Sequence, residues 1–141
     1  MQTYYGPGLI AAILWLTAGH AEAADLRFVQ PWIREAPPGM QVLAGYVEIA
    51  NHGQQDRRIT AAHSPDFARI EFHRTIIDGD MARMVAQETV ALPAGQTVWF
   101  EPGGSHLMLF EPRRRLRTGD RVTLEFRFAN GDRIAVSATV E

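Results

Sequence analysis

The sequence contains no cysteine among its 141 residues. A domain without cysteine folds without disulfides and cannot use a thiolate as nucleophile or metal ligand. This excludes blue-copper electron-transfer sites, which need a cysteine ligand, and also cysteine proteases and zinc sites built on cysteine. Any metal site in this chain must use other side chains.

Lysine is absent too, because all 14 basic residues are arginine, and the formal net charge is −2. Proteins that bind nucleic acid concentrate basic side chains on one surface, so we expect no nucleic-acid partner. Four arginines do gather over residues 113–117. Such a cluster is typical of a solvated loop between strands. The alternative is a docking patch for an acidic partner, since charges at an interface rim steer encounter.

Long apolar runs are missing as well. The run over residues 9–18 has the length of a signal-peptide core and is too short to span a bilayer. Ala21-Glu22-Ala23 then supplies a cleavage site of the A-x-A type. We expect residues 1–23 to be a signal peptide, and residues 24–141 to be one exported domain with no membrane span after cleavage. No basic residue precedes the run, and the alternative is a core helix.

Helical periodicity is absent after this run, and short β-type runs broken by turn residues take its place. Strands of this number and length are typical of an all-β Greek-key sandwich. We expect strands over residues 27–34, 42–50, 57–63, 67–76, 81–92, 97–101, 106–111, 122–128 and 133–140.

The last two of these strands form the best-defined hairpin. Matching their apolar faces places Phe126 opposite Ile134 and leaves the loop Ala129-Asn130-Gly131. A three-residue hairpin loop favours a left-handed residue at its third position, which glycine adopts without strain. Turn chemistry and burial therefore agree on this register.

A second hairpin is predicted around Asp78-Gly79, a strong signal for a two-residue type I′ turn. In that register His73 lies directly opposite Met84. Directly opposed residues share a face of the sheet, so this histidine and this methionine would be neighbours. Met81 would lie on the other face, beside Ile76, and we expect it in the core.

A second histidine–methionine pair follows the Gly103-Gly104 turn. His106 and Met108 point to the same face because side chains alternate along a strand, while Leu107 and Leu109 point toward the core. The sequence thus predicts two such pairs, each on the face opposite the core.

Each residue of these pairs has an ordinary explanation, as packing for a methionine and as a surface group for a histidine. Together, two thioethers and two imidazoles without a carboxylate form a ligand set that selects Cu(I). The residues alone leave both interpretations open, and a non-metal binding module is a third. An enzyme is not expected: Ser105 beside His106 is a lone nucleophile–base neighbour, and adjacent strand residues point to opposite faces.

The spacing His73-x10-Met84-x21-His106-x-Met108 resembles the H-x10-M-x21-H-x-M pattern of the PCu(A)C family of copper chaperones. Flanking segments are similar as well, and the likeness covers about residues 27 to 141. These segments include Trp32-Ile33-Arg34, Leu92-Pro93-Ala94-Gly95 and Pro102-Gly103-Gly104.

The resemblance implies a cupredoxin-like Greek-key sandwich in the periplasm. It implies that His73, Met84, His106 and Met108 hold one Cu(I), which is delivered toward the binuclear copper centre of cytochrome c oxidase. The acceptor would be subunit II of the oxidase or another copper chaperone; copper storage or resistance is the alternative. Some relatives carry a His- and Met-rich extension, which is not found before Glu141, so a single site is expected.

Overall fold

The computed structural model describes residues 25–141, so the expected signal peptide lies outside the described residues. Within this range no helix is long and apolar enough to cross a membrane. The secondary structure consists of ten strands: β1 (Leu26–Ile33), β2 (Val42–Asn51), β3 (Arg57–His63), β4 (Phe67–Asp78), β5 (Met81–Gln87), β6 (Val90–Leu92), β7 (Thr97–Phe100), β8 (Ser105–Pro112), β9 (Arg121–Phe128) and β10 (Arg133–Val140).

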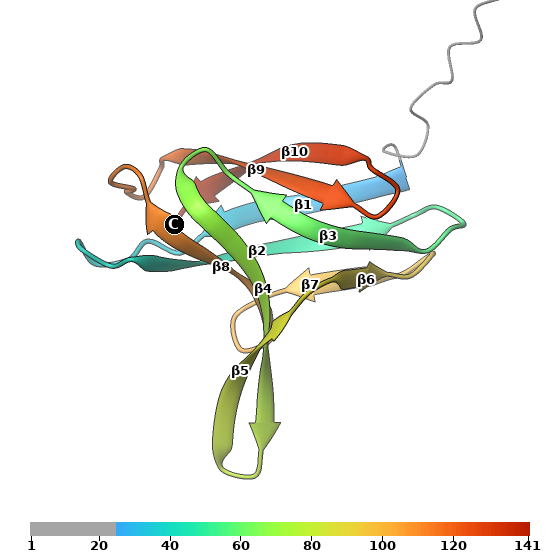
Figure 1. Cartoon of the computed structure of the whole chain (residues 1–141), viewed down its shortest axis with the longest axis horizontal. Helices are drawn as coiled ribbons and strands as arrows, with labels where there is room; N and C mark the ends of the chain where they lie inside the picture. The colour runs from blue at the N-terminus through green and yellow to red at the C-terminus, as the bar shows by residue number, and fades with distance from the viewer. Residues whose placement is uncertain (1–24) are drawn as a thin grey trace, which may run out of the picture.

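The strands form one continuous sheet in the order β5-β4-β8-β7-β2-β1-β10-β9-β3-β6, with β8 also paired to β2. All pairings are antiparallel except β1 with β10 and β7 with β8. Figure 1 shows the strands stacked in two layers, with β9 and β10 in the upper one and β7 in the lower one. β6 is drawn near β7 in this view but is hydrogen-bonded to β3, which pairs with β9. The β4–β5 hairpin projects below this body. The predicted all-β sandwich is confirmed.

One predicted strand, over residues 81–92, is divided in the structure. Its first part, β5, pairs with β4, and its second part, β6, pairs with β3 at the opposite end of the sheet order. A bend at residues 88 and 89 separates the two. The chain therefore leaves the hairpin and joins another layer, which a run of β-forming residues does not reveal.

The core lies between the two layers and is built from alternate residues of the strands. In β9 the buried positions are 122, 124, 126 and 128, the period of two expected of a strand with one face inward. Burial of each large apolar side chain contributes about 1.5–3 kcal/mol before entropy is counted. Fully buried members include Ile33, Ile49, Ile59, Phe67, Leu92, Leu107, Leu109, Leu124 and Phe126.

The β9–β10 hairpin has the predicted register. Phe126 lies opposite Ile134, and Gly131 closes the loop with a φ of +92°. The Gly131 N–H donates to the carbonyl of Phe128 at 2.9 Å. Here the demand of the turn and the demand of the core select the same pairing.

The predicted register of the β4–β5 hairpin is wrong by two residues. Asp78 pairs with Met81, so the turn residues are Gly79 and Asp80, and the positive φ (+60°) falls on Gly79 alone. A type I′ turn on Asp78-Gly79 would put aspartate in the left-handed region. The observed turn instead puts glycine first, as a type II′ turn requires.

This shift separates His73 from Met84 along the hairpin but leaves both on the same face of the sheet. His73 lies opposite Ala86, and Met84 lies opposite Thr75. Because the shift is an even number of residues, His73 and Met84 still share a face, now as diagonal neighbours. Met81, expected in the core, is 74% exposed, since the tip of this hairpin projects beyond the sandwich and has no layer across it.

Candidate metal centre

The four candidate ligands lie on one face of three adjacent strands, β5, β4 and β8. His73 on β4 lies directly opposite His106 on β8. Their rings stack with centroids 5.8 Å apart and an interplanar angle of 30°. The structure therefore brings together two histidines that are 33 residues apart in the sequence.

The two methionines lie on either side of this histidine pair. On β8, Met108 follows His106 by two residues and lies opposite Glu71. On β5, Met84 lies opposite Thr75, which follows His73 by two residues on β4. The two methionines are therefore displaced in opposite directions along the strands. Diagonal neighbours on a sheet are about 7–8 Å apart, within reach of a long, flexible side chain.

Exposure differs across the site and is highest on β5. His106 is 6% exposed and the His73 side chain 13%, Met108 is half-buried, and Met84 is 63% exposed. His106 lies on the face opposite the buried Leu107 and Leu109, as expected, but this part of the face is covered. The β7–β8 turn folds against β4, where the carbonyl of Gly104 accepts a hydrogen bond from the Thr75 N–H at 3.2 Å.

The same carbonyl selects which nitrogen of the neutral His106 ring carries the hydrogen. Nδ1 of this ring lies 3.2 Å from the oxygen of Gly104. A carbonyl oxygen can only accept, so Nδ1 carries the hydrogen in this contact. In the neutral ring, Nε2 is then the nitrogen with a free lone pair.

His73 has the complementary arrangement. Its Nε2 lies 2.8 Å from Oε2 of Glu71, and a carboxylate accepts, so Nε2 carries the hydrogen. Nδ1 is buried and has no hydrogen-bond partner among the described residues. A buried nitrogen without a partner costs free energy, which binding to a metal would recover.

Glu71 contacts a candidate ligand, and the sequence analysis did not single it out. Its other oxygen accepts a hydrogen bond from Nε of Arg69 at 2.8 Å. The hydrogen bond from Arg69, and next the one from His73, hold the pKa of Glu71 below the ordinary glutamate value, so the carboxylate is charged at neutral pH. Alternation places Arg69, Glu71 and His73 on one face of β4, and that pattern is readable in the sequence.

The donor set defines the chemistry available here. In its neutral form each of the two imidazoles offers one bare nitrogen, as metal-binding histidines do when the other nitrogen donates to a carbonyl or carboxylate. Two thioethers on the same face add soft ligands. No group of three or more His, Cys, Asp or Glu side chains within residues 25–141 is arranged to hold a metal ion. The site therefore fits a soft ion such as Cu(I) better than zinc, calcium or magnesium.

A family model described as "Putative lipoprotein LpqE-like" matches residues 26–140. This chain belongs to the LpqE-like family. Protein RP573 of Rickettsia prowazekii is 32% identical over 127 residues, which cover 85% of this chain and 68% of that protein. Among solved structures, Cu(I)-bound DR1885 of Deinococcus radiodurans is 26% identical, with a TM-score of 0.66 over 79% of this chain and 75% of that one.

The copper-bound PCuAC domain of PmoF2 is 23% identical, with a TM-score of 0.70 over 83% of this chain and 92% of that domain, which shows a shared fold. The resemblance of this LpqE-like chain to the PCu(A)C family is thereby confirmed. So is its cupredoxin-like β-sandwich architecture.

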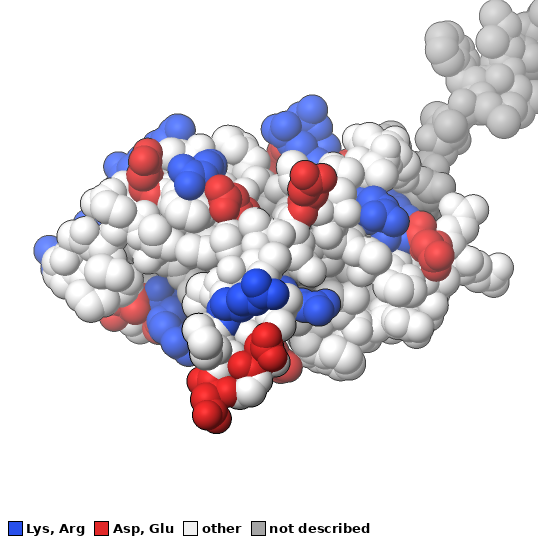
Figure 2. All heavy atoms as spheres, turned by 60° about the horizontal axis from the view of Figure 1, so that its bottom comes forward, with Lys and Arg blue, Asp and Glu red and all other residues white. Residues whose placement is uncertain are grey.

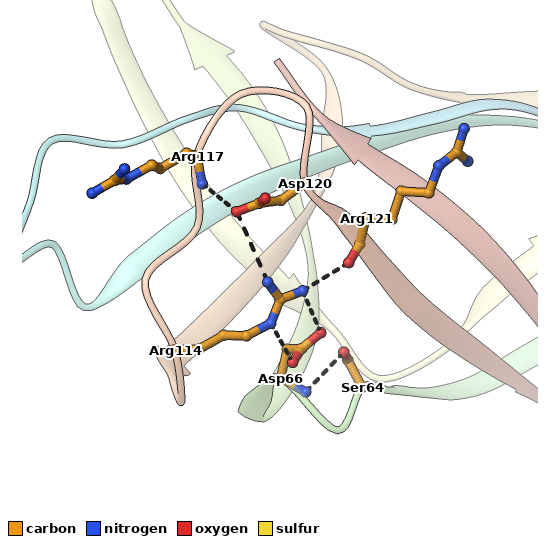
Figure 3. Close-up of polar contacts among 6 residues, drawn as sticks. All are labelled: Ser64, Asp66, Arg114, Arg117, Asp120 and Arg121. Carbon is orange, nitrogen blue, oxygen red and sulfur yellow. Dashed lines mark hydrogen bonds and ion pairs between the residues drawn. The ribbon is translucent and has the colours of Figure 1, made fainter.

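The arginine cluster of this LpqE-like protein contains a structural contact. Arg114 binds both oxygens of Asp66, at 2.8 and 3.2 Å, and donates to the carbonyl of Arg121 at 2.7 Å (Figure 3). Asp66 is itself held in place, because its N–H donates to the buried Ser64 hydroxyl at 3.2 Å. Arg114 therefore ties the loop after β8 to the turn before β4, the two strands that carry the histidines.

On the one face drawn in Figure 2, the charges do not single out a docking patch. On the face shown in Figure 2, arginines and acidic residues are interspersed. For Arg114, whose guanidinium also lies 3.8 Å from Asp120, the loop interpretation is favoured over a patch for an acidic partner.

Proposed function

We propose that this protein is a periplasmic copper chaperone that binds one Cu(I) through His73, Met84, His106 and Met108. The observation that carries the proposal is the histidine pair. Each ring donates one N–H to a fixed oxygen and leaves its other nitrogen bare, so both are ready to bind a metal without rearranging their protons.

The chemistry of the donors and the similar proteins support copper as the cargo. Imidazole nitrogens with thioether sulfurs favour Cu(I). Two similar structures are named as copper-bound, one of them as the Cu(I) form. The lipoprotein name of the family supports an exported location, and neutral thioethers stay usable in an oxidising compartment. No catalytic role is proposed.

The gradient of exposure across the site favours delivery. Met84 is 63% exposed on β5, at the end of the sheet, whereas His106 is 6% exposed on an internal strand. A ligand of an acceptor protein can replace Met84 before the buried side of the site is disturbed. We propose the binuclear copper centre of cytochrome c oxidase as the destination, through its subunit II or another copper chaperone.

Titration of the mature protein with Cu(I) under reducing conditions tests the binding. We expect one ion per chain and, by X-ray absorption, a mixed shell of nitrogen and sulfur. A shell without sulfur, or a stoichiometry well above one, would contradict the proposed site.

Delivery is tested in cells. A strain that lacks the protein should lose cytochrome c oxidase activity when copper is scarce and regain it when copper is added. Normal oxidase activity at limiting copper would leave copper storage as the better interpretation.

A further inference from the structure

Glu71 connects His73 to a fixed part of the sheet. One carboxylate oxygen accepts from Nε2 of His73 at 2.8 Å, and the other accepts from Nε of Arg69 at 2.8 Å. The guanidinium of Arg69 in turn lies 3.8 Å from the centroid of the Phe110 ring, directly across from it on β8. These contacts form a continuous chain from Phe110 through Arg69 and Glu71 to His73.

This series of contacts decides which nitrogen of the neutral His73 ring keeps a lone pair. A neutral imidazole whose Nε2 hydrogen is held by a carboxylate keeps its lone pair on Nδ1. That Nδ1 is buried and has no partner among residues 25–141. Without the carboxylate, the hydrogen could occupy either nitrogen and the ring could turn about its side-chain bonds.

We propose that Glu71, held by Arg69, is the positioning residue that makes His73 bind Cu(I) through Nδ1. The inference rests on the proposed function. It assigns Glu71 no place among the ligands, because its two oxygens are already committed to Arg69 and His73. Outer partners of this kind commonly change metal affinity by about 10–100-fold when removed.

The chain offers a matched control on β9. There Glu125 accepts from Nε of Arg127 at 3.0 Å, with the same two-residue spacing. The side-chain exposures are also close, 31% for Glu125 and 37% for Glu71. Glu125 has no contact with a candidate ligand. A substitution at Glu125 therefore shows how the loss of such an ion pair affects the fold alone.

The experiment compares the wild type with Glu71→Ala, Glu71→Gln and Glu125→Gln. In the copper-free proteins, nitrogen NMR of the imidazoles reports which ring nitrogen carries the hydrogen. We expect His73 to have it on Nε2 in the wild type and in Glu125→Gln, and to lose that preference in Glu71→Ala. Glu71→Gln should retain part of it, since the amide oxygen can still accept from Nε2 but the amide nitrogen cannot accept from Arg69.

Competition for Cu(I) against a chromogenic chelator completes the test. Glu71→Ala should bind about 10–100-fold more weakly, Glu71→Gln should recover part of the loss, and Glu125→Gln should match the wild type. Unchanged affinity and an unchanged ring in both Glu71 variants would overturn the positioning role while wild-type binding upholds the proposed function. Failure of the wild type to bind Cu(I) would instead reject the function, and the positioning role with it.

Discussion

The two sides of the candidate site differ in how firmly the fold holds them. His106 and Met108 lie on β8, which pairs with β4 on one side and with β2 and β7 on the other. Met84 lies on β5, which pairs only with β4 within the described sheet and belongs to a projecting hairpin (Figure 1). We call β8, together with His73 opposite His106 on β4, the inner side, and β5 with Met84 the outer side.

The difference shows how one site can combine retention with release. On the inner side, ligand positions follow from the packing that forms the core, since Leu107 and Leu109 on the same strand are fully buried. On the outer side few buried contacts oppose movement, and such elements open at low free-energy cost. We therefore expect Cu(I) binding to depend mainly on the histidines, and exchange to begin at Met84.

The largest expected effect comes from removing a histidine. His106→Ala and His73→Ala should each weaken Cu(I) binding by more than about a hundredfold, above the loss typical of an outer partner. His106→Ala should also lower the free energy of unfolding of the copper-free protein, by about 1–3 kcal/mol, because it empties a buried position. Chelator competition and urea unfolding measure the two effects.

The comparison between the two histidines provides the control. His73→Ala removes a side chain that is 13% exposed, and we expect a smaller change in stability for a similar loss of affinity. If both variants bound Cu(I) like the wild type, the inner side would not be a metal site.

A smaller effect is expected from the methionines. Met84→Leu should change the free energy of unfolding by no more than about 0.5 kcal/mol, since the side chain is largely exposed. Met108→Leu should cost less than about 1.5 kcal/mol, because leucine and methionine have similar volumes. Both should weaken Cu(I) binding and reduce oxidase activity in copper-limited cells.

Oxidation by peroxide separates the two methionines directly. In the copper-free protein Met84 should form its sulfoxide faster than the half-buried Met108, and Cu(I) should protect both. Peptide mass spectrometry measures each rate, with the exposed Met40 as an internal reference. Equal oxidation of Met84 with and without Cu(I) would remove it from the ligand set.

The sequence predicted the fold wherever local and distant requirements agreed. Gly131 and the apolar faces of β9 and β10 both demand the same register, and the structure has it. Around Asp78 the turn had no such support, because the hairpin projects beyond the core and no buried face selects a register. The observed pairing there differs from the predicted one by two residues, and Met81 is exposed instead of buried.

The sequence predicted the shared face of the candidate ligands, but not their surroundings. An even shift preserves the face of a strand, so His73 and Met84 stayed on the predicted side. The burial of His106 depends on how the turn at Gly104 folds against β4, which no local pattern reveals. The sequence shows that Glu71 alternates with His73 on one face of the strand. A role for Glu71 can be inferred only once the structure shows which nitrogen of the His73 ring has no partner.

The smallest expected effect concerns acid and tests Glu71 as a support of the inner side. Its pKa is lowered in the folded protein by the hydrogen bonds from Arg69 and His73. A carboxyl group with a lowered pKa stabilises the fold above its ordinary pKa near 4.5 and loses that contribution as pH falls through the lowered value. The contribution is small because the side chain is 37% exposed and water screens the pair. Urea unfolding of the copper-free wild type and Glu71→Gln should therefore show a modest gap at pH 7 that narrows below pH 4.5. A gap that stays constant across this range would mean that packing, and not charge, accounts for the stabilisation by Glu71.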